Sequence, residues 1–427
     1  MQVEELYQKY LETGKVSTDT RKITRGSVFF ALKGPTFNGN QYAQEALDKG
    51  ASYAVVDEAA YAKDPRCLLV ADTLIALQQL ARHHRSQLSI PVIGLTGSNG
   101  KTTTKELVNA VLSTTFKTYA TQGNLNNHIG VPVTVLSIET SCQIAIVEMG
   151  ANRLGEIEML CSICNPTHGF ITNIGKAHIG TFGGFDNIVR GKSELYQHLI
   201  THGGIVFINS RNPILANMAR RFKDPIFYPA AGDYYHCEPA DGGDYLALIA
   251  ENGERVETRM TGIYNFENAA VALAIGKFFG VDARKANAAV ANYAPGNMRS
   301  QVVRTGSNTI ILDAYNANPT SMEAALENLS QMPATRKVAI LGDMYELENE
   351  ARAEHERLGV LLSEKKISDA YLCGPLMASA YKTFPKGKYF PSKDLLIAEL
   401  KSNPVTQAVI LVKASRGMAL EQVVDYL

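Results

Sequence analysis

The 427-residue sequence has no excess of charge of either sign, because 42 lysine and arginine residues balance 42 aspartate and glutamate residues. A chain without net charge has no electrostatic footprint for duplex nucleic acid or an anionic membrane surface. No apolar run approaches the roughly 20 residues of a membrane-spanning helix. The N-terminus also lacks the basic start and apolar core of an export signal. We therefore expect a cytoplasmic protein without a nucleic-acid or membrane partner.

Cysteine is scarce as well. Six cysteines are scattered along the chain, and Cys161 and Cys164 form a single CxxC pair. A zinc ribbon needs two such pairs, and a zinc finger needs histidines at a set spacing. The sequence therefore favours reduced, partly buried thiols over a zinc site.

Length and alternation of strand and helix patterns predict three α/β domains. The chain is too long for one ordinary core, and its 45% hydrophobic and 20% charged residues are typical of a globular protein. We expect a small N-terminal α/β domain at residues 1–88 and a central P-loop-type domain with a parallel sheet at residues 89–296. A C-terminal Rossmann-like α/β domain is expected at residues 297–427. Within the central domain, the stretch 241–244 is expected to be a hairpin or surface excursion.

Polar residues follow three apolar strands of the predicted central sheet. Glu148, Asn173 and Asn209 each stand where such a strand ends. The carboxyl ends of the strands are where open α/β sheets bind ligands. This edge is therefore the expected position of the active site.

The segment Thr96-Gly-Ser-Asn-Gly-Lys-Thr-Thr103 follows an apolar strand and precedes a helical pattern. Glycines let successive backbone N–H groups converge on an anion, and a helix N-terminus adds positive potential. Lys101 is expected to reach the β- and γ-phosphates of a nucleotide, and the Thr102 hydroxyl to meet Mg²⁺. The spacing G-x-x-G-x-x-G-K-T departs from the strict P-loop, and a simple tight turn is the alternative. We expect a site for ATP or GTP.

Several segments, in the same order along the chain, resemble the Mur ligase family. Besides the phosphate loop, they are Asn124-Leu-Asn-Asn-His-Ile-Gly-Val-Pro-Val-Thr134, Glu148-Met-Gly150, Asn173-Ile-Gly-Lys-Ala-His178, Gly191-Lys-Ser-Glu194, Tyr264-Asn-Phe-Glu-Asn-Ala-Ala270, Leu312-Asp-Ala-Tyr-Asn-Ala-Asn-Pro-Thr-Ser-Met322 and Leu411-Val-Lys-Ala-Ser-Arg416. The last two, with Ser17-Thr-Asp-Thr-Arg21, resemble the member that adds D-alanyl-D-alanine to UDP-MurNAc-tripeptide. Two positions depart from the family pattern: Tyr264 stands where histidine is common, and Asn38-Gly39-Asn40 where relatives often have Asp-Gly-His.

The resemblance implies an ATP-dependent ligase that joins a carboxylate to an amine through an acyl phosphate. UDP-MurNAc-tripeptide and D-Ala-D-Ala would be its substrates, in peptidoglycan precursor synthesis in the bacterial cytoplasm, and we expect a monomer. A sibling ligase that adds the third amino acid is one alternative, although its usual Asp-Asn-Pro-Arg segment does not occur here. A folylpolyglutamate-synthase-like ligase and a non-catalytic nucleotide-binding scaffold are two others.

The resemblance also assigns roles to residues. Catalytic residues are implied at Lys101, Glu148, His178 and Lys192, and Mg²⁺ ligands at Thr102, Glu148, His178 and Lys192. Two Mg²⁺ ions are expected, with Lys192 carbamylated. Nucleotide-binding residues are implied at Gly97, Ser98, Asn99, Gly100, Lys101, Thr102, Thr103, Asn265, Asn268, Arg299 and Asp313. Substrate-binding residues are implied at Ser17, Asp19, Arg21, Asn124, Asn126, Asn127, Tyr315, Asn316, Asn318, Lys413, Ser415 and Arg416.

Without the resemblance, the residues themselves leave other interpretations open. A lone His178 is more often a satisfied polar side chain than a metal ligand, and Lys192 could be an exposed helix lysine. Asn265 and Asn268 lie three apart on a predicted helix, so they could face adenine together or act as a cap and a packed amide. The asparagines of residues 124–127 could equally build a turn.

Overall fold

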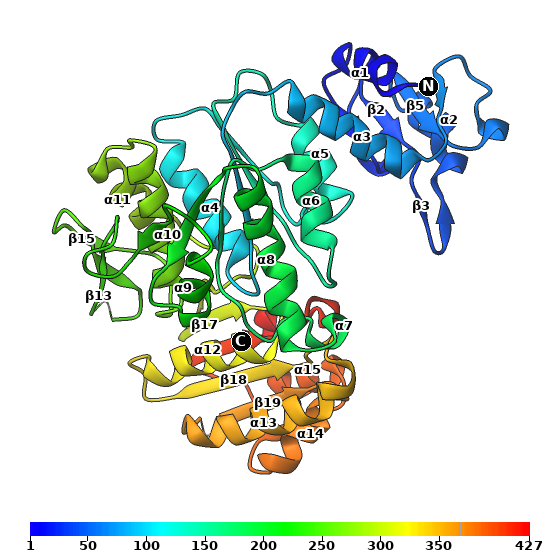
Figure 1. Ribbon diagram of the computed structural model, residues 1–427. Coiled ribbons are helices and arrows are strands. Elements are labelled where there is room, and N and C mark those ends of the chain that lie inside the picture. Colours follow the sequence, from blue (N-terminus) through cyan, green and yellow to red (C-terminus); the bar gives the residue numbers. More distant parts are fainter. Residues whose placement is uncertain (242, 368) are drawn as a thin grey trace.

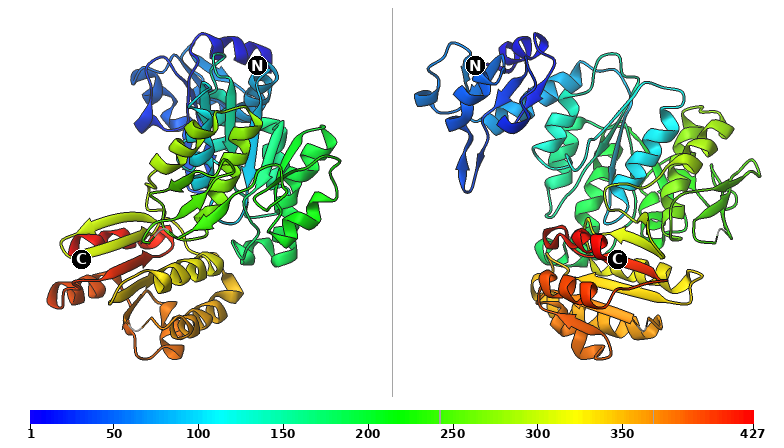
Figure 2. Two further views of the ribbon diagram at one scale, coloured as in Figure 1. Left: turned by 90° about the vertical axis from the view of Figure 1, so that its left-hand side faces the viewer. Right: turned by 180° about the vertical axis from the view of Figure 1, so that it is seen from behind.

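The computed structural model describes residues 1–241, 243–367 and 369–427, and it divides into three α/β parts (Figure 1). The N-terminal part is blue in the figure, the middle part cyan to green, and the C-terminal part yellow to red. The N-terminal and C-terminal parts pack at different ends of the middle part (Figure 2). The predicted fold class, three α/β domains with parallel sheets, is confirmed.

A four-stranded parallel sheet forms the N-terminal part. Its strands, in spatial order, are β1 (Val16–Ser17), β2 (Val28–Phe30), β5 (Tyr53–Val56) and β6 (Cys67–Leu69), and its helices are α1 (Val3–Leu11), α2 (Ala43–Asp48) and α3 (Thr73–Ser86). An antiparallel hairpin of β3 (Lys33–Gly34) and β4 (Phe37–Asn38) projects from this part (Figure 1). Helix α3 packs against α5 and α6 of the middle part, so the two parts share one hydrophobic core.

The middle part contains a six-stranded parallel sheet. Its strands, in spatial order, are β12 (Ile226–Tyr228), β11 (Ile205–Asn209), β10 (His168–Ile171), β7 (Val92–Thr96), β9 (Ile144–Glu148) and β8 (Thr118–Ala120). Every residue of β7 and β9 is buried, because helices cover both faces of the sheet. Full burial explains their continuous apolar runs.

Helices pack on both faces of the middle sheet. They are α4 (Lys101–Leu112), α5 (Gly130–Leu136), α6 (Glu156–Cys164), α7 (Ile179–Phe182), α8 (Phe185–Thr201), α9 (Pro213–Ala219), α10 (Asn265–Phe278) and α11 (Ala283–Asn292). Helices α4, α10 and α11 pack against one another, and α6 packs against α8 and α3. A small antiparallel sheet of β13 (Glu238–Ala240), β14 (Ala247–Ile249) and β15 (Arg255–Glu257) follows β12. Strands β13 and β14 are therefore the arms of the expected hairpin, within which Gly242 lies outside the described residues.

The C-terminal part has its own six-stranded sheet, in which β16 alone runs antiparallel to its neighbour. Its strands, in spatial order, are β16 (Gln301–Thr305), β17 (Asn308–Asp313), β21 (Val409–Lys413), β18 (Lys337–Gly342), β19 (Asp369–Cys373) and β20 (Lys388–Phe390), with helices α12 (Pro319–Gln331), α13 (Ala351–Glu364), α14 (Met377–Thr383) and α15 (Lys393–Ser402). Asn318 caps α12, with Pro319 at its first position. The loop after β17 ends at this capped start of α12, where Asn318 contacts the middle part.

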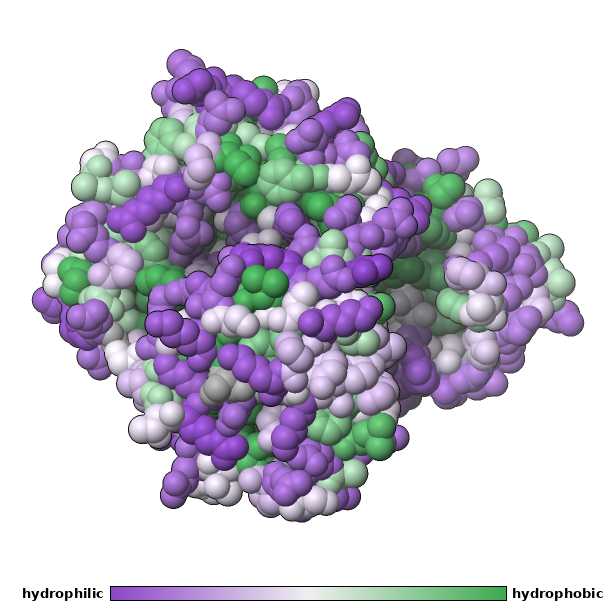
Figure 3. Space-filling model, turned by 90° about the horizontal axis from the view of Figure 1, so that it is seen from below, coloured by the Kyte–Doolittle hydropathy of each residue, from purple (hydrophilic) through white to green (hydrophobic). Residues whose placement is uncertain are grey.

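The face seen from below in Figure 3 carries apolar residues scattered among hydrophilic ones, as on most protein surfaces. Among the described residues, no helix is both long enough and apolar enough to cross a membrane.

Candidate active site between the middle and C-terminal parts

A cavity of about 810 Å³ opens at the carboxyl end of the middle sheet, where the C-terminal part faces it. It brings together most of the residues that the sequence singles out. These are Ser98, Asn99, Gly100, Lys101, Thr102, Thr103, Asn124, Asn126, Asn127, Glu148, His178, Asn265, Asn268, Arg299, Asp313, Tyr315, Asn316, Asn318 and Lys413. The predicted nucleotide site and much of the predicted substrate site therefore form one continuous space.

Seven predicted residues lie elsewhere in the described chain. They are Ser17, Asp19 and Arg21 in the N-terminal part, Gly97 after β7, Lys192 in α8, and Ser415 and Arg416 after β21. Asp19 and Arg21 form an exposed ion pair at 2.8 Å. The structure does not bring this N-terminal group together with the cavity.

The phosphate loop joins β7 to α4 in a fixed conformation. Asn173, at the end of β10, accepts hydrogen bonds from the backbone N–H groups of Ser98 and Asn99 at 2.9 and 3.0 Å. Gly100 has a φ of +78°, and a Cβ there would meet Oδ1 of Asn268 at 2.7 Å. Only glycine meets both demands, the positive φ and the close approach.

Lys101 begins α4 and curls back over the loop. Its Nζ donates to the carbonyl oxygen of Gly97 at 2.7 Å and to that of Ser98 at 3.3 Å. Burial lowers the pKa of Lys101, the carboxylate of Glu148 raises it, and the guanidinium of Arg299 lowers it. The ammonium therefore lies in a half-buried, charged setting that suits an anionic phosphate.

Glu148, at the end of β9, presents a carboxylate that is 1% exposed. Its oxygens accept hydrogen bonds from the Thr102 hydroxyl at 3.0 Å and from Nδ2 of Asn126 at 2.8 Å. A buried carboxylate beside a hydroxyl supplies the hard oxygen donors that Mg²⁺ prefers. Glu148 is therefore a buried group of the site and not an exposed carboxylate at a strand end.

Lys192, on α8, is 1% exposed, so the exposed-lysine interpretation is wrong. Its Nζ donates to the carbonyl oxygen of Ala151 at 3.1 Å and lies 5.3 Å from the ring centre of Phe182. Burial, reinforced by the positive charge of Lys101, lowers the pKa of Lys192 to about 7. A substantial fraction of this amine is therefore neutral near neutral pH.

His178 pairs with the C-terminal part. Its Nδ1 lies 2.6 Å from Oε2 of Glu346, and this contact lowers the pKa of Glu346. The pairing shows that His178 has a carboxylate partner from another part of the chain. Glu346 lines the cavity too, but no pattern in the sequence had singled it out.

Asp313 and Lys413 face each other at the ends of neighbouring strands β17 and β21. Their charged groups are 2.5 Å apart, and the Lys413 side chain is 2% exposed. The backbone N–H of Ser300 donates to the other oxygen of Asp313 at 3.2 Å. Lys413 therefore orients Asp313, in addition to lining the cavity.

We expect Lys413→Met to lower the free energy of unfolding by about 2–3 kcal/mol, because it leaves a carboxylate without its ammonium partner. This is less than for a fully buried pair, since the Asp313 side chain is 18% exposed. Urea-induced unfolding measures the loss. Lys388→Met is the matched control, because it breaks a more exposed pair between β20 of the same sheet and α15 and should cost below about 1 kcal/mol. Equal losses in the two variants would contradict the assignment.

Two further groups line the cavity. The Arg299 guanidinium lies 3.7 Å from the ring centre of Tyr315. Asn268 accepts a hydrogen bond from the Thr104 hydroxyl at 2.9 Å and donates one to Asn265 at 2.9 Å. The two asparagines are therefore packed amides that also line the cavity, but neither is the N-cap of α10, which is Tyr264.

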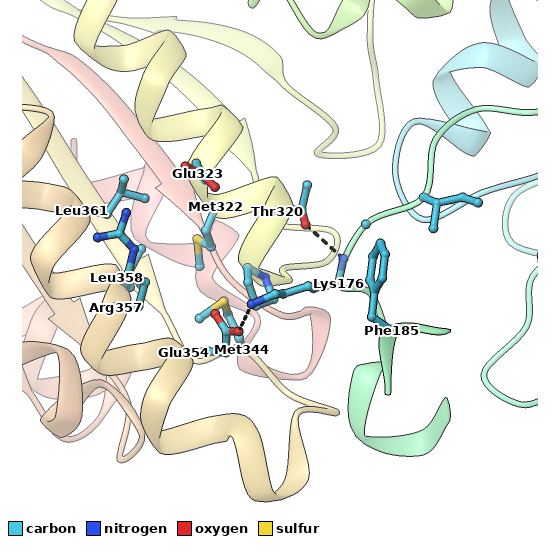
Figure 4. Close-up of a pocket in the computed structure, with 13 residues that line it drawn as sticks. Lys176, Phe185, Thr320, Met322, Glu323, Met344, Glu354, Arg357, Leu358 and Leu361 are labelled. Atoms are coloured by element: carbon cyan, nitrogen blue, oxygen red, sulfur yellow. Dashed lines mark hydrogen bonds and ion pairs between the residues drawn. The ribbon is translucent and has the colours of Figure 1, made fainter. Parts of the chain in front are cut away.

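The middle and C-terminal parts also touch directly. Nδ2 of Asn318 donates to Oδ1 of Asn99 in the phosphate loop at 2.8 Å. Figure 4 shows a second, smaller cavity of about 310 Å³ beside this contact. There Lys176 of the middle part pairs with Glu354 at 2.7 Å, and its backbone N–H donates to the Thr320 hydroxyl at 3.1 Å. The C-terminal part is therefore held over the phosphate loop by polar contacts.

Known families account for nearly the whole chain. The Mur ligase family catalytic domain matches residues 13–94, the Mur ligase middle domain residues 95–276, and the Mur ligase glutamate ligase domain residues 298–416. The chain belongs to the Mur ligase family. The resemblance stated from the phosphate loop and the later segments is confirmed.

Three relatives of this Mur ligase show how far the similarity extends. The UDP-N-acetylmuramoyl-tripeptide–D-alanyl-D-alanine ligase of Bacillus subtilis is 36% identical, over 96% of this chain and 92% of its own length. A crystal structure of MurF from Acinetobacter baumannii has a TM-score of 0.87 at 31% identity, covering 99% of this chain and 97% of its own. MurF from Thermotoga maritima, in complex with ADP, has a TM-score of 0.85 at 27% identity, covering 97% of each chain.

Proposed function

We propose that this Mur ligase joins D-alanyl-D-alanine to UDP-MurNAc-tripeptide at the expense of ATP, forming UDP-MurNAc-pentapeptide, ADP and phosphate. The main support for the proposal is that the phosphate loop, Glu148 and the C-terminal part all line one cavity. The names of the relatives supply the substrates. The sibling ligase and the folylpolyglutamate-synthase-like ligase are alternatives that fewer observations support.

The cavity suits an acyl-phosphate route. A carboxylate oxygen of the tripeptide bonds to the γ-phosphorus while the bond to the ADP oxygen breaks. The neutral amine of the dipeptide then bonds to the acyl carbon, phosphate leaves with its oxygen, and the amine loses a proton. Lys101 and the N-terminus of α4 would neutralise the phosphoryl oxygens, and Asn318 would position the loop. Such positioning and charge neutralisation are what phosphoryl transfer asks of a protein.

The donor set at Glu148 fits Mg²⁺. A carboxylate and the Thr102 hydroxyl lie side by side, and both are hard oxygen donors. Bound there, Mg²⁺ would supply positive charge for the phosphates of the nucleotide. A second ion would need ligands as well. Because Nδ1 of His178 is already paired with Glu346, we expect these ligands to be chiefly the oxygens of a modified Lys192.

The setting of Lys192 supports its carbamylation. The neutral amine attacks the carbon of CO₂, an N–C bond forms, and one proton leaves to solvent, so that a carbamate replaces an ammonium. The reaction requires a neutral amine, which burial provides by lowering the pKa of Lys192 to about 7. The two carbamate oxygens would be ligands of the type that Mg²⁺ prefers.

The three substrates would bind to different parts of the chain. We assign the UDP-sugar to residues 1–88, with Ser17, Asp19 and Arg21, and ATP chemistry to residues 89–296. The dipeptide is assigned to residues 297–427. Its site would use the cavity residues Tyr315 and Asn316 and the neighbouring Ser415 and Arg416, whose guanidinium lies 5.6 Å from the Tyr315 ring centre. A monomeric state and a cytoplasmic location are also predictions.

A substrate comparison tests the proposed specificity. Purified protein, ATP and Mg²⁺ are combined with UDP-MurNAc-tripeptide, UDP-MurNAc-dipeptide or folate, and each of these is tested in separate reactions with D-Ala-D-Ala, diaminopimelate, lysine or glutamate. Products are identified by mass. We expect pentapeptide with D-Ala-D-Ala alone. Ligation of diaminopimelate or lysine to UDP-MurNAc-dipeptide would favour the sibling ligase, and ligation of glutamate to folate the other alternative.

We expect the C-terminal part to close on the middle part when nucleotide and substrates bind. The segment after Pro295 contains three residues other than glycine in the left-handed region, Asn297, Met298 and Ser300, with φ of 55°, 57° and 51°. Such strain persists only where the surroundings enforce it, and it often marks switch regions. Solution scattering should show a smaller radius of gyration after addition of an ATP analogue and substrates. Scattering curves that do not change on this addition would contradict the closure. Asn318→Ala should weaken the response, because this variant loses the contact to Asn99.

A further inference from the structure

Three sulfur atoms meet behind the active site, at the CxxC pair that the ligase reaction does not use. The thiols of Cys161 and Cys164, on successive turns of α6, each lie 3.8 Å from Sδ of Met149. All three residues are 0% exposed. Among the described residues, no three His, Cys, Asp or Glu side chains are grouped to hold a metal ion, so two thiols and a thioether form a donor set of another kind.

The spacing suits a soft ion. Metal–sulfur bonds are about 2.3 Å long, so three sulfurs around one ion at trigonal angles are about 4 Å apart. Thiolate and thioether ligands select Cu(I), whereas Mg²⁺ prefers oxygen. The two distances from the thiols to the Met149 sulfur therefore match those expected around one soft ion.

Charge compensation is also present. Two thiolates and one Cu(I) carry a net charge of −1, which is costly to bury without a partner. Arg85 is buried, and its guanidinium donates to the carbonyl oxygens of Cys164, Leu88 and Asn165 at 2.9, 2.6 and 3.1 Å. Glu194 and Glu158 act in the opposite sense, since both disfavour the thiolate of Cys161. The positive charge of Arg85, which lies beside Cys164, thus offsets part of the negative charge of the metal site.

We propose that Met149, Cys161 and Cys164 form a binding site for Cu(I), in which both thiols lose a proton and the thioether is the third ligand. Two protons are released for each Cu(I) that binds, and no oxidation state changes. Binding would also reach the ligase reaction, because Met149 directly follows Glu148 and its methyl group packs where a side chain of Gly94 would lie. A metal bound to the Met149 sulfur would restrict the movement of the strand end that carries Glu148.

The test is a competition titration of the full, reduced chain with Cu(I), without oxygen, against a chromophoric Cu(I) chelator. The double variant C161A/C164A should bind at least about 100-fold more weakly than the native chain, and Met149→Leu about 10-fold more weakly. Cys142→Ala, another buried cysteine, should bind like the native chain. Thermal melting confirms that each variant is folded. A double variant with native affinity would overturn the proposal.

Proton release gives an independent readout. Burial raises the pKa of the Cys164 thiol to about 12 and that of Cys161 well above its usual value. Both thiols are therefore protonated between pH 6 and 8, and the affinity for Cu(I) should rise about 100-fold per pH unit. A rise of about 10-fold per unit would mean binding by a single thiol and would contradict the site. Neither readout requires that the protein be a ligase, so the proposed function can fail separately.

Discussion

Replacing Lys101 with alanine is expected to lower the rate of ATP-dependent ligation at least about 10²–10³-fold, the cost of removing one preorganised charge from a phosphoryl-transfer site. The Lys101 ammonium is held over the loop by the carbonyl oxygens of Gly97 and Ser98. In the proposed reaction it exchanges these neutral partners for phosphate oxygens, so its interaction strengthens as charge develops. Initial rates of phosphate release at saturating substrates measure the loss.

A matched control separates this effect from damage to the fold. Lys117 lies in the same part of the chain, and its ammonium pairs with Glu139 at 3.0 Å on the surface. Lys117→Ala should keep the native rate. A Lys101→Ala protein that melts like the native one yet turns over at a comparable rate would refute the assignment of the phosphate loop.

Lys192→Ala is expected to have the second largest effect, about 10²-fold or more, because it removes the proposed metal-binding carbamate. The native enzyme should also lose activity in buffer freed of CO₂ and regain it on addition of bicarbonate. Activity that responds to CO₂ should decline as pH falls through about 7, where Lys192 takes up a proton and can no longer react. The sign is that of an amine whose pKa burial has lowered: the reactive neutral form is lost on the acidic side.

Two controls accompany this prediction. Sodium chloride at the same concentration must not replace bicarbonate, and Lys192→Ala must not respond to either salt. Full activity of Lys192→Ala would be fatal to the carbamate, and so would native activity that is unaffected by removal of CO₂.

Most of the fold was predictable because its signals are local. The apolar runs of β7, β9, β10 and β11 are fully or largely buried parallel strands, and such strands leave an unbroken hydrophobic pattern. Short edge strands escaped prediction, including β8, β12 and β20. Each has only three residues, which is too short for a periodicity, and the neighbouring strand decides their conformation.

The site was predictable where residues stand at strand ends or in the phosphate loop. Glu148 is the example, since its position after an apolar strand suffices to place it at the ligand-binding edge. Contacts between residues far apart in the sequence gave no such signal. Glu346 meets His178, and Lys413 meets Asp313 across 100 residues of sequence. The first pairing arises when two parts of the chain pack together and the second when two distant strands become neighbours in one sheet, so spacing along the chain does not predict either.

The central claim is that ATP chemistry, the sugar peptide and the dipeptide meet in one site. Phosphate release in the presence of ATP, UDP-MurNAc-tripeptide and D-Ala-D-Ala, compared with reactions that omit each in turn, tests it most directly. We expect rapid release only in the complete mixture, with one pentapeptide formed per phosphate, because the cavity is shared by the middle and C-terminal parts. Comparable release from the enzyme with ATP alone, or release without pentapeptide, would contradict the account.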